Sequence, residues 1–253
     1  MDTMGRGKEY LENVTSKLKR AEETQAEAIR KAGVMIADNY AADRLLHVYG
    51  GGGHTVMMVC EMFFRAGGFA NVNPIFGHDI SPLCQALKYL AIERSVGYGS
   101  CLIQYYDLQK DDLLIIFHNI GVNPTTIDAA EEAKKRGAKI IAVSSHLWRE
   151  QLPKEHHIRH PNGKHLFEYA DLCIDDENPY GDADFKVEGF DAAFAPTSTI
   201  VDAYIAHRMV IEAVAEMVKR GLQPPVFRSA NLPDGDKKNA ELIKRYRSRV
   251  KDL

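Results

Sequence analysis

Apolar residues follow two different spacings along the chain, and the change between them falls near residue 43. From Lys8 to Arg44 they recur at helical intervals in a segment rich in alanine, glutamate and lysine. Beyond it, short apolar runs alternate with helical segments, which is typical of a parallel sheet with helices on both faces. The pattern predicts one or two amphipathic helices ahead of an α/β unit.

Five apolar runs are short enough to be buried strands. The predicted strands are residues 45–49, 71–76, 113–118, 140–143 and 170–174. The predicted helices of the core and the tail are residues 55–65, 81–93, 125–137, 197–220 and 237–250. We expect a helical N-terminal arm over residues 1–42, an α/β core over 43–222 and a C-terminal extension over 223–253.

Two local features refine this organisation. Thr125 with Asp128 predicts a capping box for the third helix of the core. The segment from Ser144 to Tyr169 carries two prolines and five histidines, and it is predicted to be irregular. A loop of that length is usually functional or lies at an interface.

The composition is that of a globular protein with room for a sizeable core. Hydrophobic residues make up 45% and charged residues 26% of the 253 residues. The sequence shows no apolar leader segment and no apolar run long enough to span a membrane. A soluble protein that does not bind membranes is therefore expected. With 32 Lys and Arg against 35 Asp and Glu, the net charge of −3 gives no overall positive field that would attract nucleic acid.

Four cysteines are scattered through the chain without a C-x-x-C pair. They are Cys60, Cys84, Cys101 and Cys173. Three of the four sit inside apolar runs, so buried, reduced thiols are expected. Reduced thiols predict a cytoplasmic protein.

Four consecutive glycines, Gly50 to Gly53, follow the first strand and precede a helix. The dinucleotide pattern G-x-G-x-x-G would need glycine at Thr55 or Val56, and no G-x-x-x-x-G-K-[ST] occurs, so NAD binding and nucleotide hydrolysis lose their main support. A tight turn needs one or two glycines rather than four. We therefore predict ligand contact, close to the backbone, by Gly51, Gly52, Gly53 and Thr55.

A second loop, residues 118–126, also leaves a strand and enters a helix. In open α/β sheets, ligands bind in the crevice outside such strand ends. The predicted anion-binding residues of this loop are Asn119, Gly121, Asn123, Thr125 and Thr126. The two threonines either give hydroxyls and backbone N–H groups to an anion or cap their helix, and both can be true.

These motifs together resemble the sugar isomerase (SIS) domain family. The resemblance rests on the glycine turn, the N-x-G-x-N-P-T turn and A-K-I-I-A-V-S-S, and it sharpens in residues 159–164, 181–183, 195–200 and 224–227. It runs from about Lys8 to Val250 and is strongest to a bacterial branch often labelled phosphoheptose isomerase or SIS domain protein. It implies a three-layer α/β sandwich with a parallel sheet of about five strands.

The resemblance implies aldose–ketose isomerisation of a phosphorylated or otherwise anionic sugar through an enediol, with no redox cofactor and no obligatory metal. Phosphate loops of the family are richer in Ser and Thr, whereas His118, Ile120 and Asn123 stand here. A sulfonated sugar is therefore an alternative substrate. A sugar-phosphate lyase or etherase and a non-catalytic sugar-phosphate-binding regulator are alternative functions, because the family contains all of these.

Isomerisation needs a base held over the carbon skeleton of the open-chain sugar. The resemblance places Glu61 where phosphoheptose isomerases and the muramic acid phosphate etherase have their catalytic glutamate. The alternative for Glu61 is an i,i+4 ion pair with Arg65, which contributes only about 0.3–0.5 kcal/mol.

Ring opening and the second proton need a group that titrates near neutrality, which favours histidine. His54 and His118 lie on the two ligand loops and rank above His207 on the closing helix. Related isomerases take a histidine of a partner subunit from that helix region, but a core or interface histidine is the alternative for His207. A homodimer or homotetramer is expected.

Residues further along the chain complete the predicted site. The resemblance extends the substrate-binding set to Ser144, Ser145, Arg159, Lys164, Thr197 and Ser198. Arg159 and Lys164 would bind the charged end of the substrate. Four nearby histidines, His156, His157, His160 and His165, have a spacing compatible with zinc, but a polar loop or subunit contact is the preferred interpretation.

Overall fold

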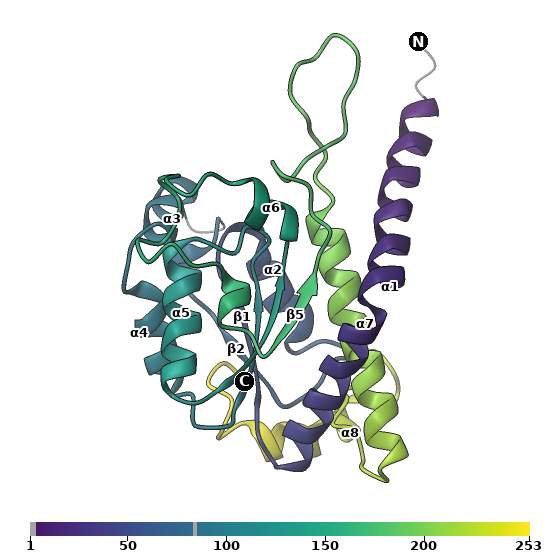
Figure 1. The fold of residues 1–253 in the computed structure, drawn as a ribbon. Coiled ribbons are helices and arrows are strands. Elements are labelled where there is room, and N and C mark those ends of the chain that lie inside the picture. Colours follow the sequence, from purple (N-terminus) through teal and green to yellow (C-terminus); the bar gives the residue numbers. More distant parts are fainter. Residues whose placement is uncertain (1–3, 83–84) are drawn as a thin grey trace.

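The apolar runs form one parallel sheet, and a computed structural model shows the predicted three-layer sandwich (Figure 1). The structure describes residues 4–82 and 85–253. The strand order is β2-β1-β3-β4-β5. The strands are β1 (Leu46–Gly50), β2 (Val72–Ile75), β3 (Leu113–Phe117), β4 (Lys139–Ser144) and β5 (Leu172–Asp175). Strands β1, β2 and β3 are buried throughout, because helices cover both faces of a parallel sheet.

Two hydrophobic clusters, one on each face, hold the layers together. The first face is covered by α1 (Met4–Ala41), α2 (Val56–Met62) and α7 (Ser198–Lys219). The second is covered mainly by α4 (Tyr98–Tyr106) and α5 (Pro124–Lys135), with α3 (Ala86–Glu93) packed beside them. Two further helices are α6 (His146–Gln151), directly after β4, and α8 (Gly235–Tyr246) near the C-terminus.

The strand order fixes where the chain leaves a crevice. From β1 the chain moves to β2 on one side, and from β3 it moves to β4 on the other. The loops after β1 and β3 therefore diverge at the carboxyl edge of the sheet, where ligands of such folds bind. These are the glycine turn and the loop 118–123.

The N-terminal arm is one helix, and it packs along α7 (Figure 1). Arg208 of α7 lies 2.9 Å from Glu22 of α1, and the Tyr204 hydroxyl donates to the same carboxylate at 2.8 Å. Farther out, α1 also holds the loop between β5 and α7, since Lys17 forms a salt bridge with Asp184 at 2.6 Å. Helix α1 thus positions both α7 and a loop that reaches the crevice.

Several predicted boundaries are wrong for local reasons. Helix α4 was not predicted, because Gly97 and Gly99 were interpreted as the end of the preceding helix. Gly99 lies inside α4, where the Thr125 carbonyl occupies the space that a Cβ would need. The predicted capping box is also wrong: α5 begins at Pro124, and the Asp128 carboxylate accepts from the Gly97 N–H at 2.5 Å. The segment predicted to be irregular contains α6.

The expected burial of the cysteines is wrong for Cys60 and Cys101, which are exposed, and Cys173 is partly buried. All three are free thiols. Cys84 lies outside the described residues. Across residues 4–82 and 85–253, no helix is long and apolar enough to cross a membrane.

Gly33 tests how closely α1 and α7 approach. An alanine in mid-helix would ordinarily stabilise by about 1 kcal/mol. A Cβ on Gly33 would collide with Glu212 and the backbone of α7, so Gly33→Ala is expected to destabilise by about 1–3 kcal/mol in urea unfolding. The control is Gly7→Ala, on the exposed part of α1 with nothing nearby, which should be neutral or stabilising. Equal effects at both positions would contradict the close packing.

Candidate active site

A pocket of about 230 Å³ lies at the carboxyl ends of β1 and β3, and we call it the switch-point pocket. Eight of its lining residues were predicted from the sequence: Gly52, Gly53, His54, Thr55, His118, Asn119, Asn123 and Ser198. Sequence reasoning missed the polar lining residues Tyr89, Glu93, Arg94, Asn178 and Asp182. The pocket thus gathers the two predicted loops, the end of α3 and the two ends of the loop between β5 and α7.

The glycine turn is packed against protein side chains. A Cβ on Gly52 would collide with the Glu93 carboxylate, and one on Gly51 would collide with the Thr126 hydroxyl. Gly53 has φ of +52°, which favours glycine. The run of glycines is therefore explained largely by close contact with α3 and α5, and ligand contact is not needed to account for it.

The predicted threonine hydroxyls are engaged inside the protein. Thr125 and Thr126 are fully buried, and both hydroxyls donate to the Gly51 carbonyl, at 3.0 and 3.2 Å. The Thr55 hydroxyl donates to the Gly52 carbonyl at 2.5 Å. Of the alternatives for the threonines, this geometry favours a structural role, in which the hydroxyls tie the glycine turn to the start of α5.

A buried carboxylate and imidazole face each other in the wall of the pocket. His118 Nε2 lies 3.5 Å from Glu93 Oε1, and the two residues are 2% and 6% exposed. The Gly121 N–H donates to His118 Nδ1 at 2.8 Å, so Nε2 carries the proton of the neutral ring. His118 therefore presents an N–H toward Glu93. The sequence offered one signal for Glu93: it lies four residues after Tyr89, so both side chains share one face at the end of a predicted helix.

Asn119 bridges two buried carboxyl groups behind the pocket. Its Nδ2 donates to Asp176 at 2.7 Å and to Asp202 at 2.9 Å. Burial raises the pKa of Asp202 to about 7, and burial beside Asp202 raises the pKa of Asp176 well above its usual range. The pair retains a proton toward neutral pH, because two adjacent carboxylates out of water cannot both ionise cheaply. The Asn119 amide is thus engaged by carboxyl groups.

Buried polar atoms of three lining residues have no partner in the part of the chain that the structure describes. They are Asn123 Oδ1, Asp182 Oδ1 and both side-chain amide atoms of Asn178. Such atoms normally find a hydrogen bond, so each requires an explanation. A polyhydroxyl compound carries closely spaced donors and acceptors of the kind that would pair them after a small rearrangement.

Glu61 and His207, which are 146 residues apart, meet outside the switch-point pocket. His207 Nε2 lies 2.7 Å from Glu61 Oε1. The alternative ion pair of Glu61 with Arg65 is present as well. Burial, with the charge of Arg65, lowers the pKa of His207, so its ring is neutral at pH 7. Glu61 is six residues beyond Thr55 and His207 nine beyond Ser198, so they lie about 9 and 14 Å along their helices from the pocket.

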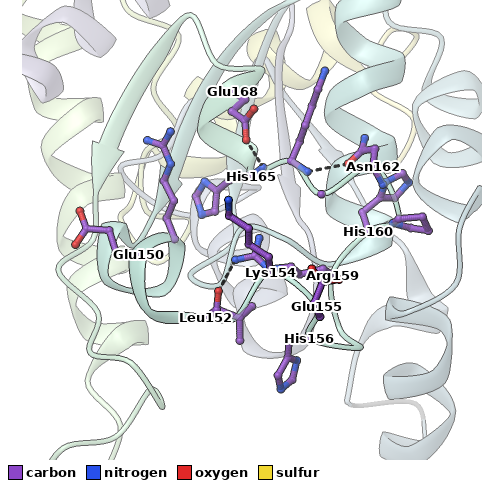
Figure 2. A pocket seen from close by; sticks show the side chains of 14 residues that line it. Glu150, Leu152, Lys154, Glu155, His156, Arg159, His160, Asn162, His165 and Glu168 are labelled. Carbon is purple, nitrogen blue, oxygen red and sulfur yellow. Dashed lines mark hydrogen bonds between the residues drawn. The ribbon is translucent and has the colours of Figure 1, made fainter.

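Arg159 and Lys164 line a different cavity, a hollow of about 690 Å³ at the surface (Figure 2). Arg159 donates to the carbonyls of Leu152 and Pro153 at 2.8 and 2.9 Å. Lys164 lies over the Tyr169 ring, 5.0 Å from its centroid. The sequence analysis placed these two cations in one site with the glycine turn. Within a single copy of the chain, the structure instead puts them in a separate cavity.

The histidines of this segment have different contacts and do not converge on one point. His160 Nε2 lies 3.2 Å from Asp128, and His156 stacks on His157 with ring centroids 4.6 Å apart. Burial lowers the pKa of His165 to about 3, so this ring stays neutral. No three His, Cys, Asp or Glu side chains within residues 4–82 and 85–253 are grouped so that they could hold a metal ion.

The remaining predicted binding residues lie one layer behind the pocket. The Ser144 hydroxyl donates to the Asn119 carbonyl at 3.2 Å, and the Ser145 hydroxyl donates to the Asn178 carbonyl at 2.6 Å. Thr197 is fully buried and accepts from Lys17 at 2.8 Å. A Cβ on Gly121 would collide with His165 and Ser144. These residues support the loops that line the pocket.

The family follows from comparison with known proteins. The SIS domain model matches residues 9–145, more than half of the chain. The chain belongs to the SIS domain family. A UPF0309 protein of Thermoanaerobacter pseudethanolicus is 35% identical over 97% of this chain and 99% of its own length. A UPF0309 protein of Listeria innocua is 32% identical over 95% of this chain and 96% of its own.

Two solved structures share the fold of this SIS domain chain. A phosphoheptose isomerase from Francisella tularensis has a TM-score of 0.53 at 14% identity, over 85% of this chain and all of that one. A phosphoheptose isomerase from Neisseria gonorrhoeae has a TM-score of 0.55 at 11% identity, over 84% of this chain and 98% of that one. At these identities the likeness shows the architecture, as the resemblance predicted.

The Asp176–Asp202 pair makes a prediction about pH. A carboxyl whose pKa is near 7 in the folded state and about 3.9 in the unfolded state costs stability as pH rises between those values. Asp202→Asn removes that cost. The variant should therefore gain stability over the parent protein, and the gain should be about 2.6 kcal/mol larger at pH 8 than at pH 5.

Urea unfolding at the two pH values measures this difference. Asp191→Asn is the control, because it removes the same charge at an exposed position. A gain for Asp202→Asn that does not change with pH would mean that the pair does not hold a proton in the folded protein.

Proposed function

We propose that the chain catalyses aldose–ketose isomerisation of a phosphorylated or otherwise anionic sugar, with Glu61 as the base. The observation that carries the proposal is the 2.7 Å contact between Glu61 and His207. The resemblance implied each residue separately, and the packing of α2 on α7 brings them together. A base with an oriented imidazole is what proton transfer along a sugar needs.

The reaction moves two protons. Glu61 takes the proton from C2 of the open-chain aldose, the C1=C2 bond of the enediol forms, and Glu61 returns the proton to C1. A hydroxyl proton passes from O2 to O1, and the neutral ring of His207 is the group that relays it. The i,i+4 partner Arg65 forms a salt bridge with the Glu61 carboxylate.

We propose that a second copy of the chain supplies Glu61 and His207 to the pocket. Neither residue is among the described residues that line it, and both are partly exposed, with 29% and 50% of their side-chain surface accessible. Exposed apolar residues flank the pair: Met57 one turn before Glu61, and Ile211 one turn after His207. Exposed apolar side chains that lie close together mark contacts between proteins, so a homodimer or homotetramer is proposed.

We place the sugar in the switch-point pocket. The unpaired atoms of Asn123, Asn178 and Asp182 would bind its hydroxyls, and Arg94 with the N-terminus of the 12-residue helix α5 would attract its anionic group. A sulfonate would be attracted by the same groups as a phosphate. The exposed free thiols of Cys60 and Cys101 fit a reducing compartment, so a cytoplasmic location is proposed.

Replacement of Glu61 tests the base. Glu61→Gln keeps the shape of the side chain and should lower kcat by at least about 100-fold, while the thermal unfolding midpoint and ligand affinity stay near the parent values. Isomerisation is followed by NMR on sedoheptulose 7-phosphate, glucose 6-phosphate, ribose 5-phosphate and a 6-sulfonated glucose. The matched control is Arg65→Gln, which breaks the same ion pair and should lower kcat far less. An equal loss of kcat in both variants would mean that Glu61 acts only as the ion-pair partner of Arg65 and not as the base.

Mixed oligomers test whether the site is shared between copies. Glu61→Gln and Arg94→Ala should each be nearly inactive alone, because one lacks the base and the other lacks the pocket cation that would attract the anionic group of the sugar. When the two variants are mixed in equal amounts and exchange subunits, half of the dimers contain one copy of each variant. Each of these mixed dimers holds one intact site of two, so about a quarter of the parent activity should return. A monomer in light scattering, or no recovery on mixing, would contradict the shared site.

A further inference from the structure

The surface hollow formed by residues 149–168 is a second cavity, which the proposed isomerisation leaves unused (Figure 2). Its volume is about 690 Å³, against about 230 Å³ for the switch-point pocket, and the two cavities have no lining residue in common. We call it the cationic hollow, because its lining includes Arg149, Lys154, Arg159 and Lys164.

The charged side chains of the cationic hollow are not paired with one another. Within the described residues, none of its four cations forms a salt bridge, and neither does any of its three glutamates, Glu150, Glu155 and Glu168. The Glu168 carboxylate accepts from the His165 N–H at 2.8 Å. Glu150 points away from the other labelled side chains in Figure 2. The hollow therefore has an excess of positive charge that protein carboxylates do not neutralise.

Arg159 is held in place by contacts that leave its charge unsatisfied. Its Nη2 and Nε donate to the carbonyls of Leu152 and Pro153, at 2.8 and 2.9 Å. Backbone carbonyls fix the guanidinium but carry no charge to neutralise it. The N–H groups left on Nη1 and Nη2 suit two oxygens of one phosphate, which a guanidinium binds with two parallel hydrogen bonds. Arg159 is thus preorganised for an anion.

His165 adds a buried donor to the lining. It is 2% exposed, and its Nδ1 accepts from the Phe167 N–H at 3.2 Å, so Nε2 carries the proton. Nε2 has no hydrogen-bond partner in the part of the chain that the structure describes. It lies beside Gly121, and a small shift of that loop would let it donate to an anion on the floor of the hollow. A buried donor of this kind requires a partner.

We infer that the cationic hollow is a second ligand site, which binds a small molecule that carries a diphosphate group. Several separate cations favour a ligand with more than one negative charge, and the volume admits an anion larger than a phosphate ion. The net charge of −3 for the whole chain argues against an extended polyanion such as nucleic acid. Free diphosphate and a nucleoside diphosphate share this chemistry.

The hollow lies against the loop that lines the switch-point pocket. The His160 N–H donates to the Val122 carbonyl at 2.8 Å, and the Leu166 N–H donates to the Gly121 carbonyl at 2.7 Å. A ligand that orders the walls of the hollow therefore also restrains the loop 118–123. This is the position of an effector site, from which occupancy is transmitted to the pocket.

Titration calorimetry with pyrophosphate tests the site, and the fluorescence of Trp148 gives a second readout. Trp148 is the only tryptophan and lies on α6, which contributes to the hollow, so its emission should change on binding. Lys154→Gln combined with Lys164→Gln should weaken binding at least about 10-fold, because two attractive charges are removed. The matched control is Lys237→Gln combined with Lys238→Gln, which removes the same charge from exposed positions of α8.

Three further measurements separate the sites and identify the ligand. Arg94→Ala, in the switch-point pocket, should leave pyrophosphate binding unchanged, whether or not the protein isomerises a sugar. Amide hydrogen exchange of residues 118–123 should slow when pyrophosphate is added. ADP that binds more tightly than pyrophosphate identifies a nucleotide as the ligand, and the reverse order identifies the free ion.

The results that would overturn the inference are equally specific. They are no binding at millimolar pyrophosphate, an equal loss of affinity in the two lysine double variants, or loss of binding in Arg94→Ala. Unchanged hydrogen exchange in residues 118–123 at saturating pyrophosphate would overturn the effector role. Since every readout is of binding, failure of the isomerase proposal leaves this test intact.

Discussion

The contact between the glycine turn and the end of α3 is the constraint on which the candidate site depends. Gly52 can approach α3 only because it lacks a side chain, and the space holds the Glu93 carboxylate. Gly51 approaches α5 in the same way, and its carbonyl accepts from both Thr125 and Thr126. These contacts fix the distance between the loops after β1 and β3 and therefore the width of the pocket. A methyl group at either glycine would separate the loops and displace Glu93 from His118.

The opposite face of the sheet contributes through its helices. Helix α1 contacts α7 through Glu22, whose carboxylate pairs with Arg208 and accepts from Tyr204. It contacts the loop after β5 through the salt bridge of Lys17 with Asp184. Because α7 begins at Ser198 in the pocket and carries His207 nine residues later, its placement fixes one lining residue of the pocket and brings His207 to Glu61. The salt bridge of Lys17 with Asp184 holds the loop that carries Asn178 and Asp182. The N-terminal arm is thus part of the site's support, although it lies far from the pocket.

Sequence reasoning succeeded where the information is local. Strands of buried apolar residues, the glycine turn and α7 are visible in a short window, and the strand order then places the two loops together. Glu93 was missed because its helix has a mixed pattern and its meaning depends on Gly52, 41 residues earlier, and His118, 25 residues later. The carboxyl pair held by Asn119 was missed for the same reason. The glycine run was predicted as a ligand feature, but its contacts are with protein side chains, which no local pattern reveals.

Burial separates the two carboxylate–imidazole pairs of this chain. Glu61 and His207 keep 29% and 50% of their side-chain surface exposed, beside the exposed apolar residues Met57 and Ile211, so a second copy of the chain could reach them. Glu93 and His118 are 6% and 2% exposed in the wall of the switch-point pocket, so they can be reached only from inside the pocket. A role for the exposed pair therefore depends on assembly in a way that a role for the buried pair does not.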